Sequence, residues 1–151
     1  MKTKYLTLGL LFVLHFAFSQ ESKYDENLAK SLNADDRGMK SYVFCLLTTG
    51  TNTTATDTEK DELFKGHMDN IKRLAKEEKL VTAGPFRKND KNYRGLFIFN
   101  VATVEEAKAL VESDPAVKAN LLQAELTPWY GSAALLKVNE IHSTITKPKK
   151  D

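Results

Sequence analysis

The chain has 151 residues, 42% of them hydrophobic and 28% charged, which leaves room for one soluble domain with a core of modest size. Its formal net charge is only +2. A charge this small argues against a protein whose function is to bind nucleic acid or an anionic membrane surface.

The first 19 residues have the pattern of a secretory signal peptide. Lys2 and Lys4 precede an apolar run at 5–18, which is too short to span a bilayer comfortably, and small residues precede the expected cleavage site after Ser19. We therefore expect export to the periplasm or the medium, with an uncleaved anchor as the alternative. Loss of the two lysines lowers the basic count from 22 to 20, equal to the acidic count, so we expect no stable membrane association afterwards.

A polar lead-in at 20–40 has weak helical periodicity and is expected to hold a short helix at most. The first strand is predicted at 41–49, where aromatic, aliphatic and β-branched residues follow one another and make both faces apolar. Cys45 lies within this strand and is the only cysteine. It has no partner for an intrachain disulfide, and we expect a buried thiol rather than a nucleophile.

An amphipathic helix is predicted at 58–78, after a capping box formed by Thr56 and Glu59. On a helical wheel its apolar stripe contains Phe64, Met68, Ile71, Leu74 and Ala75. His67 falls within the same stripe. An imidazole on the core side is compatible with a half-buried histidine bonded to a carbonyl or water. The alternative is a general base or ligand-orienting group in a pocket between helix and sheet.

Two further strands are predicted at 80–84 and 93–101, joined by a charged turn at 87–92. Because this connection is short and polar, the two strands should form an antiparallel hairpin. Gly84 and Pro85 end the first of them. We expect Gly84 to shape a pocket wall, since glycine lets other groups approach the backbone closely.

The second half of the sequence predicts another helical crossover. A helix begins at the capping box of Thr103 and Glu106 and continues to about residue 111. Asp114 and Pro115 then have the residue types preferred at the N-cap and first position of a helix. A short additional helix is therefore predicted before the last strand.

A fourth strand is predicted at 121–129, and the tail at 137–151 lacks strong signals and is expected to be flexible. The order is then β-α-β-β-α-β over residues 41–136. Its simplest closed form is α+β: a ferredoxin-like sandwich with a four-stranded antiparallel sheet and both helices on one face. The other, apolar face would need a cover, most easily the same face of a second copy, so we predict a homodimer.

Three segments occur in an order and spacing that resembles the YCII-related (YciI-like) family. They are H-x-x-x-I-x-x-L-x-x-E-x-x-L-V-T-A-G-P-F at 67–86, E-E-A-x-A-L-V-E-S-D-P at 105–115, and T-P-W at 127–129. The resemblance covers about residues 41–135. It implies a ferredoxin-like fold, dimers of the dimeric α+β barrel type, and a site that pairs a helix histidine with the aspartate of the D-P step.

Those two positions match His67 and Asp114. Most family members have no established activity, and one branch is similar to dehydrochlorinases that eliminate HCl from chlorinated hydroquinones. The leader and the long polar loop at 50–57 depart from the usual family pattern. The resemblance implies that Asp114 would orient the imidazole while the other ring nitrogen takes a substrate proton. Asp114 is also suited to capping a helix, and the two roles are compatible because a carboxylate has two oxygens.

Arg94, Tyr42 and Trp129 are secondary ligand-binding candidates. Arg94 is suited to an anionic substrate group, or to a solvated strand position. Trp129 is also typical of a core or interface aromatic residue. We expect no cofactor and no metal site, because His67 has no spaced partner of the Cys/His kind.

Three functions remain open from the sequence. The first is a small exported enzyme of the lyase or isomerase kind that uses a His67–Asp114 dyad on an unknown small molecule. The second is a non-catalytic dimeric module that binds a small ligand in the same cleft. The third is an interaction protein with a vestigial pocket. Catalysis requires the two side chains to lie within hydrogen-bond reach beside a cavity.

Overall fold

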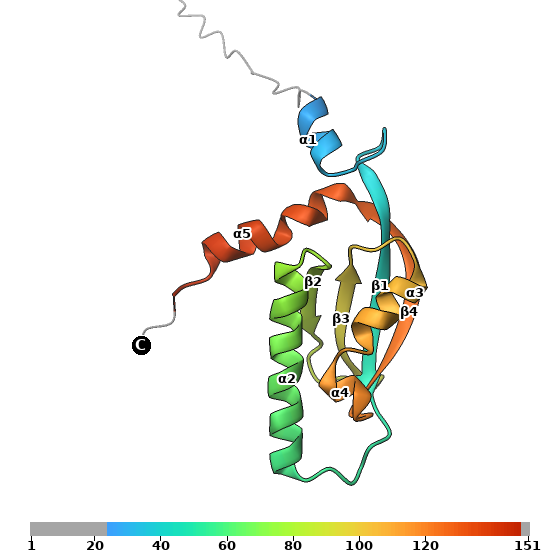
Figure 1. The fold of residues 1–151 in the computed structure, drawn as a ribbon, viewed down its shortest axis with the longest axis vertical. Helices are drawn as coiled ribbons and strands as arrows, with labels where there is room; N and C mark the ends of the chain where they lie inside the picture. The colour runs from blue at the N-terminus through green and yellow to red at the C-terminus, as the bar shows by residue number, and fades with distance from the viewer. Residues whose placement is uncertain (1–23, 149–151) are drawn as a thin grey trace, which may run out of the picture.

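The computed structural model describes residues 24–148, so the predicted leader lies outside the described residues. The chain forms a four-stranded sheet, and Figure 1 shows helices packed against it. The elements in chain order are α1 (Glu26–Ser31), β1 (Met39–Thr49), α2 (Asp57–Lys76), β2 (Leu80–Pro85), β3 (Tyr93–Phe99), α3 (Val104–Val111), α4 (Pro115–Lys118), β4 (Leu122–Ser132), the 3₁₀ helix η1 (Ala133–Lys137) and α5 (Val138–Ile145).

The sheet has the strand order β2-β3-β1-β4, and all neighbouring strands are antiparallel. Helix α2 connects β1 to β2, while α3 and α4 together connect β3 to β4. The predicted β2–β3 hairpin and the α+β, ferredoxin-like β-α-β-β-α-β order are therefore confirmed. The lead-in contains one short helix, α1, as expected.

The main core lies between the helices and one face of the sheet. Side chains alternate between the two faces of a strand, and in β1 the helix-facing set is Val43, Cys45 and Leu47, all buried. Leu74 of α2 and Val111 of α3 pack onto them. Burial raises the pKa of the Cys45 thiol to about 12, with a further contribution from the negative charge of Asp114. A thiol with this pKa stays protonated at neutral pH, so Cys45 is the buried residue that the sequence predicts.

Local hydrogen bonds begin the helices where the sequence predicts them. Thr56 accepts a hydrogen bond from the backbone N–H of Glu59, whose carboxylate accepts one from the Thr56 N–H, which completes a capping box. Thr103 and Glu106 form the same arrangement at α3. These caps satisfy backbone donors that the first helical turn leaves unpaired.

The second face of the sheet is partly covered from within the same chain. Tyr42, Val81 and Ile98 form a smaller buried cluster beneath Leu135 and Leu136. Trp129, which pairs with Tyr42 on this face, is still 39% exposed. The prediction of a bare sheet face therefore holds for part of it only, because the C-terminal segment covers one end.

The structure also differs from the predicted tail, because residues 138–145 form the helix α5. Figure 1 shows α5 extending away from the sheet beyond η1. Asn139 Nδ2 donates a hydrogen bond to the carbonyl of Leu80 at 2.8 Å, which ties the start of the helix to β2. α3 has the same length but begins at a capping box, whereas α5 has no side-chain cap, so the sequence lacks a start signal for it. No helix within residues 24–148 is long and apolar enough to cross a membrane.

Candidate functional site

A cavity of about 340 Å³ lies between α2 and the β2–β3 hairpin. Its volume is near the lower end of the range for small-molecule sites. Small residues of the hairpin leave it open, and most of the lining side chains are apolar. The lining residues are Leu47, Phe64, His67, Met68, Ile71, Ala83, Gly84, Pro85, Arg94, Gly95, Phe97 and Leu122.

His67 on α2 contacts Asp114, the N-cap of α4, across 47 residues of sequence. Its Nδ1 lies 2.7 Å from Asp114 Oδ2, and the side chains are 12% and 1% exposed. An ionised carboxylate only accepts hydrogen bonds, so Nδ1 carries the proton. Nε2 is then the ring nitrogen left for a ligand. The structure thus brings the two predicted residues together, and of the two His67 lines the cavity.

Aromatic neighbours fix the plane of the imidazole. The His67 ring stacks on Phe97 with centroids 5.9 Å apart and 25° between the planes. Phe64, one turn earlier on α2, meets the ring edge-on at 6.0 Å. Contacts on the face and the edge of the ring restrict its rotation, so Nδ1 stays directed at the carboxylate.

The two oxygens of Asp114 have separate partners. Oδ2 is bound to His67, while Oδ1 accepts hydrogen bonds from the backbone N–H groups of Ala116 at 2.9 Å and Val117 at 3.4 Å. Capping α4 and contacting the imidazole are therefore compatible, as the sequence suggested. The same residue that starts the short helix is held against α2.

The carboxylate of Asp114 is charged at neutral pH despite its burial. Burial by itself would raise the pKa of Asp114. The hydrogen bond and charge of His67, the N–H of Ala116 and the amide of Asn70 together outweigh this effect and hold the pKa below its ordinary value. Asp114 is therefore a charged acceptor for the Nδ1–H of His67.

Asn70 is a site residue that the sequence analysis missed. Its side chain is buried, and its Nδ2 lies 3.4 Å from Asp114 Oδ2. Its Oδ1 accepts a hydrogen bond from Arg73 Nη2 at 2.7 Å. Because a guanidinium only donates, the amide oxygen must face Arg73 and the amide N–H must face Asp114. The available signal was spacing, since Asn70 follows His67 by three residues and shares its helix face.

The secondary candidates separate into two groups. Gly84 and Arg94 line the cavity together with His67. Tyr42 and Trp129 do not, because strand alternation places Tyr42 on the opposite face from Val43. There the Tyr42 hydroxyl donates to the carbonyl of Ser132 at 3.0 Å, and its ring lies 5.7 Å from that of Trp129.

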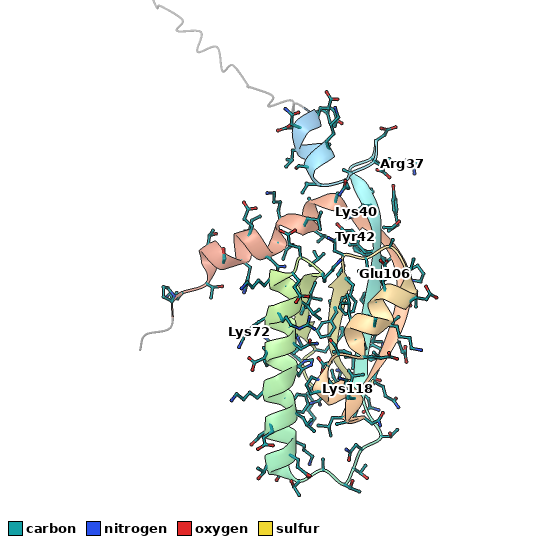
Figure 2. All side chains as sticks on the ribbon, in the orientation of Figure 1. Arg37, Lys40, Tyr42, Lys72, Glu106 and Lys118 are labelled. Carbon is teal, nitrogen blue, oxygen red and sulfur yellow. The ribbon has the colours of Figure 1, made fainter. Side chains whose placement is uncertain are left out.

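Tyr42 lies in the part of β1 nearest η1 (Figure 2).

Within the described part of the chain, no group of three or more His, Cys, Asp or Glu side chains is arranged to hold a metal ion.

Comparison with known proteins identifies the family. Residues 42–130 match the YCII-related domain, which is more than half of the chain. A similar solved structure is 5-chloro-2-hydroxyhydroquinone dehydrochlorinase (TftG) from Burkholderia phenoliruptrix, in complex with 2,5-dihydroxybenzoquinone. The two share 20% sequence identity with a TM-score of 0.42, over 58% of this chain and 92% of that one. A search of curated proteins gave no match. The chain therefore belongs to the YCII-related domain family.

Proposed function

We propose that this protein is a small, cofactor-independent enzyme that catalyses a proton transfer of the lyase or isomerase type on a small molecule. The observation that carries the proposal is the 2.7 Å contact between His67 Nδ1 and the buried Asp114 carboxylate, at the wall of a cavity. A His–carboxylate pair of this kind is a recurrent arrangement for a general base.

In this proposal His67 Nε2 removes a proton from a C–H or O–H group of the substrate. The imidazolium that forms is stabilised by Asp114, whose charge lies on the far side of the ring. The electron pair left on the substrate then either expels a leaving group, which is a lyase reaction, or forms a new double bond before the proton returns at another atom, which is an isomerase reaction. The mainly apolar lining lowers the local dielectric constant and so strengthens the attraction between this imidazolium and the Asp114 carboxylate.

The lining also indicates the kind of substrate. A cavity of about 340 Å³ suits a molecule of about one ring, and its apolar walls suit a mainly hydrophobic one. His67 and Arg94 are the only ionisable side chains among the lining residues. We therefore propose a small, largely apolar substrate with one acidic proton, and with an anionic group if Arg94 binds it.

A non-catalytic ligand-binding module is the second candidate. It is favoured by the same lining, because the described residues provide no carboxylic acid, cysteine or tyrosine at the cavity wall to protonate a leaving group. Such a module would bind the same class of molecule without converting it.

A thermal-shift screen of the mature protein tests both candidates, with phenols, enolisable keto acids and small aromatic acids as probes. Bound compounds are then incubated with the protein and followed by NMR, with His67→Ala as the matched variant. Turnover that is lost in His67→Ala while binding persists supports the enzyme. Binding without turnover supports the module. If no compound shifts the wild type, or if His67→Ala changes neither binding nor turnover, both candidates are wrong.

We also propose that the protein is a homodimer. The support is the partly exposed second face of the sheet, which carries the partly buried Phe44 and Leu96 and the exposed Trp129. A second copy would bury these side chains by a two-fold contact of like faces. Sedimentation of the mature protein over micromolar concentrations tests this, and a monomer throughout would contradict it.

Export is a separate proposal, supported by the residue pattern at positions 1–19. N-terminal sequencing of the protein purified from the periplasm or the medium should give Gln20 as the first residue. Recovery of the full-length chain in the cytosol would exclude cleavage after Ser19.

A further inference from the structure

Helices α2 and α4 are in contact next to the dyad. Gly66 immediately precedes His67, and Pro115 immediately follows Asp114. A Cβ atom placed on Gly66 would lie 2.9 Å from Pro115 Cγ and 3.4 Å from Pro115 Cβ. Carbon atoms in contact are normally about 3.5–4.0 Å apart. The absence of a side chain at position 66 therefore permits this approach of the two helices.

The backbone gives no other reason for a glycine at this position. Gly66 lies near the middle of α2 (Asp57–Lys76), where glycine disfavours a helix relative to alanine. Among the described glycines a positive φ occurs at Gly38 and not at Gly66. The local cost of the glycine is thus offset by a tertiary contact, and that contact is the one with Pro115.

From this geometry we infer that Gly66 is a positioning residue, which sets the distance between His67 and Asp114 by letting α4 pack directly against α2. That this distance matters for catalysis rests on the proposed function, whereas the role of Gly66 in setting the distance does not.

Pro115 cannot move away from residue 66 without displacing the buried residues next to it. Asp114 is 1% exposed and Ala116 is fully buried, so both neighbours of the proline are enclosed by the core. The proline ring cannot rotate away as a flexible side chain would. Relief of a clash with residue 66 therefore has to move α4 as a unit. That movement carries Asp114 away from a hydrogen bond that is now 2.7 Å long.

The test is Gly66→Ala, with two readouts that need no substrate. The first is the imidazole N–H signal of His67 in ¹⁵N-labelled protein, which should be protected from exchange in the wild type because Nδ1–H is bound to a buried carboxylate. The second is the midpoint of urea unfolding. We expect Gly66→Ala to lose the protected N–H signal and to lower the unfolding midpoint. If helix propensity alone mattered, the midpoint would rise and the signal would remain.

The double variant Gly66→Ala/Pro115→Ala provides the rescue, because it removes the Cγ atom that the new methyl group meets. We expect the double variant to recover the His67 signal. We also expect the Gly66→Ala change to lower the unfolding midpoint less in the Pro115→Ala background than in the wild type. Lys72→Ala is the control on the same helix, since Lys72 is 72% exposed and points away from the sheet (Figure 2).

The outcomes separate this inference from the proposed function. A higher midpoint with an unchanged His67 signal in Gly66→Ala overturns the positioning role and leaves the enzyme proposal standing. A wild type with no protected imidazole N–H contradicts the dyad itself. If Gly66→Ala fails to fold, a folded double variant supports the inference, and a double variant that also fails to fold overturns it.

Discussion

At the scale of single residues, Asp114 combines the capping of a helix with the contact to His67 on which the proposed function rests. One oxygen caps α4 and the other is bound to His67 and Asn70. A buried carboxylate is costly unless its charge is matched by donors, and here the donors come from two side chains of α2 and from the backbone at the start of α4. We therefore expect the stability of the fold to depend on the charge of Asp114 and on the groups that donate to it.

Acid should destabilise the protein through Asp114. Its pKa is lowered in the folded state and is about 3.9 in an unfolded chain. The charged carboxylate therefore contributes stability above about pH 4, and this contribution is lost as the pH falls through the lower, folded-state pKa. Urea unfolding between pH 2 and pH 7 measures it. In Asp114→Asn the overall stability should be lower and this part of the acid dependence should be absent.

The role of Asn70 leads to a second prediction at this scale. Asn70→Ala removes the amide that connects Arg73 to Asp114, and we expect a loss of about 1–2 kcal/mol in the free energy of unfolding. It also removes one of the groups that lower the pKa of Asp114, so that pKa should rise. Carboxyl ¹³C NMR follows the titration.

Asp69→Ala is the matched control for Asn70→Ala, because Asp69 is the adjacent residue on α2 and is exposed to solvent. An equal change in the pKa of Asp114 in both variants would contradict a specific role for Asn70.

At the scale of elements, the site is built where a helix crosses a hairpin. Ala83 of β2 pairs with Phe97 of β3, and both residues face α2 and line the cavity. The size of the cavity is set by the small side chains of the hairpin. A larger side chain at position 83 would project into the space that we propose for the ligand.

Ala83→Leu should therefore weaken or abolish ligand binding without lowering stability, because filling an apolar cavity adds buried contacts. Thermal shifts with and without a bound compound measure both effects. Thr82→Val is the matched control, since Thr82 pairs with Ile98 on the other face of the sheet. Unchanged affinity in Ala83→Leu would place the ligand elsewhere.

At the scale of the whole molecule, the two faces of the sheet have different covers. Helices α2, α3 and α4 pack on one face, while η1 covers only one end of the other. Figure 1 shows α5 projecting beyond this arrangement. The proposed dimer would use the remainder of the second face.

Leu96→Lys places a charge on that face and should shift a dimer to a monomer, because burying an unpaired charge in an interface is costly. Sedimentation measures the assembly, and circular dichroism checks that the chain is folded. Lys118→Glu, on the helical side of the molecule (Figure 2), should leave assembly unchanged. A dimer that survives Leu96→Lys would show that another surface is used.

The sequence by itself determined most of the elements and their order. The caps at Thr56, Thr103 and Asp114 locate helix starts, and the spacing of apolar residues distinguishes helices from strands. Both signals come from residues within a turn or two of one another. The apolar stripe of α2 also places His67 on the core side. The pairing of His67 with Asp114 came from the family resemblance, since the local pattern accounts for Asp114 as a cap.

Tertiary structure alone decided how these pieces form a site. It brought His67 and Asp114 to 2.7 Å across 47 residues, left a cavity beside them and directed Asn70 at the carboxylate. It also put Tyr42 on the far face of the sheet and anchored α5 through Asn139. The physical reason is that packing contacts depend on the relative position of elements distant in sequence, as the fit of Pro115 against Gly66 illustrates.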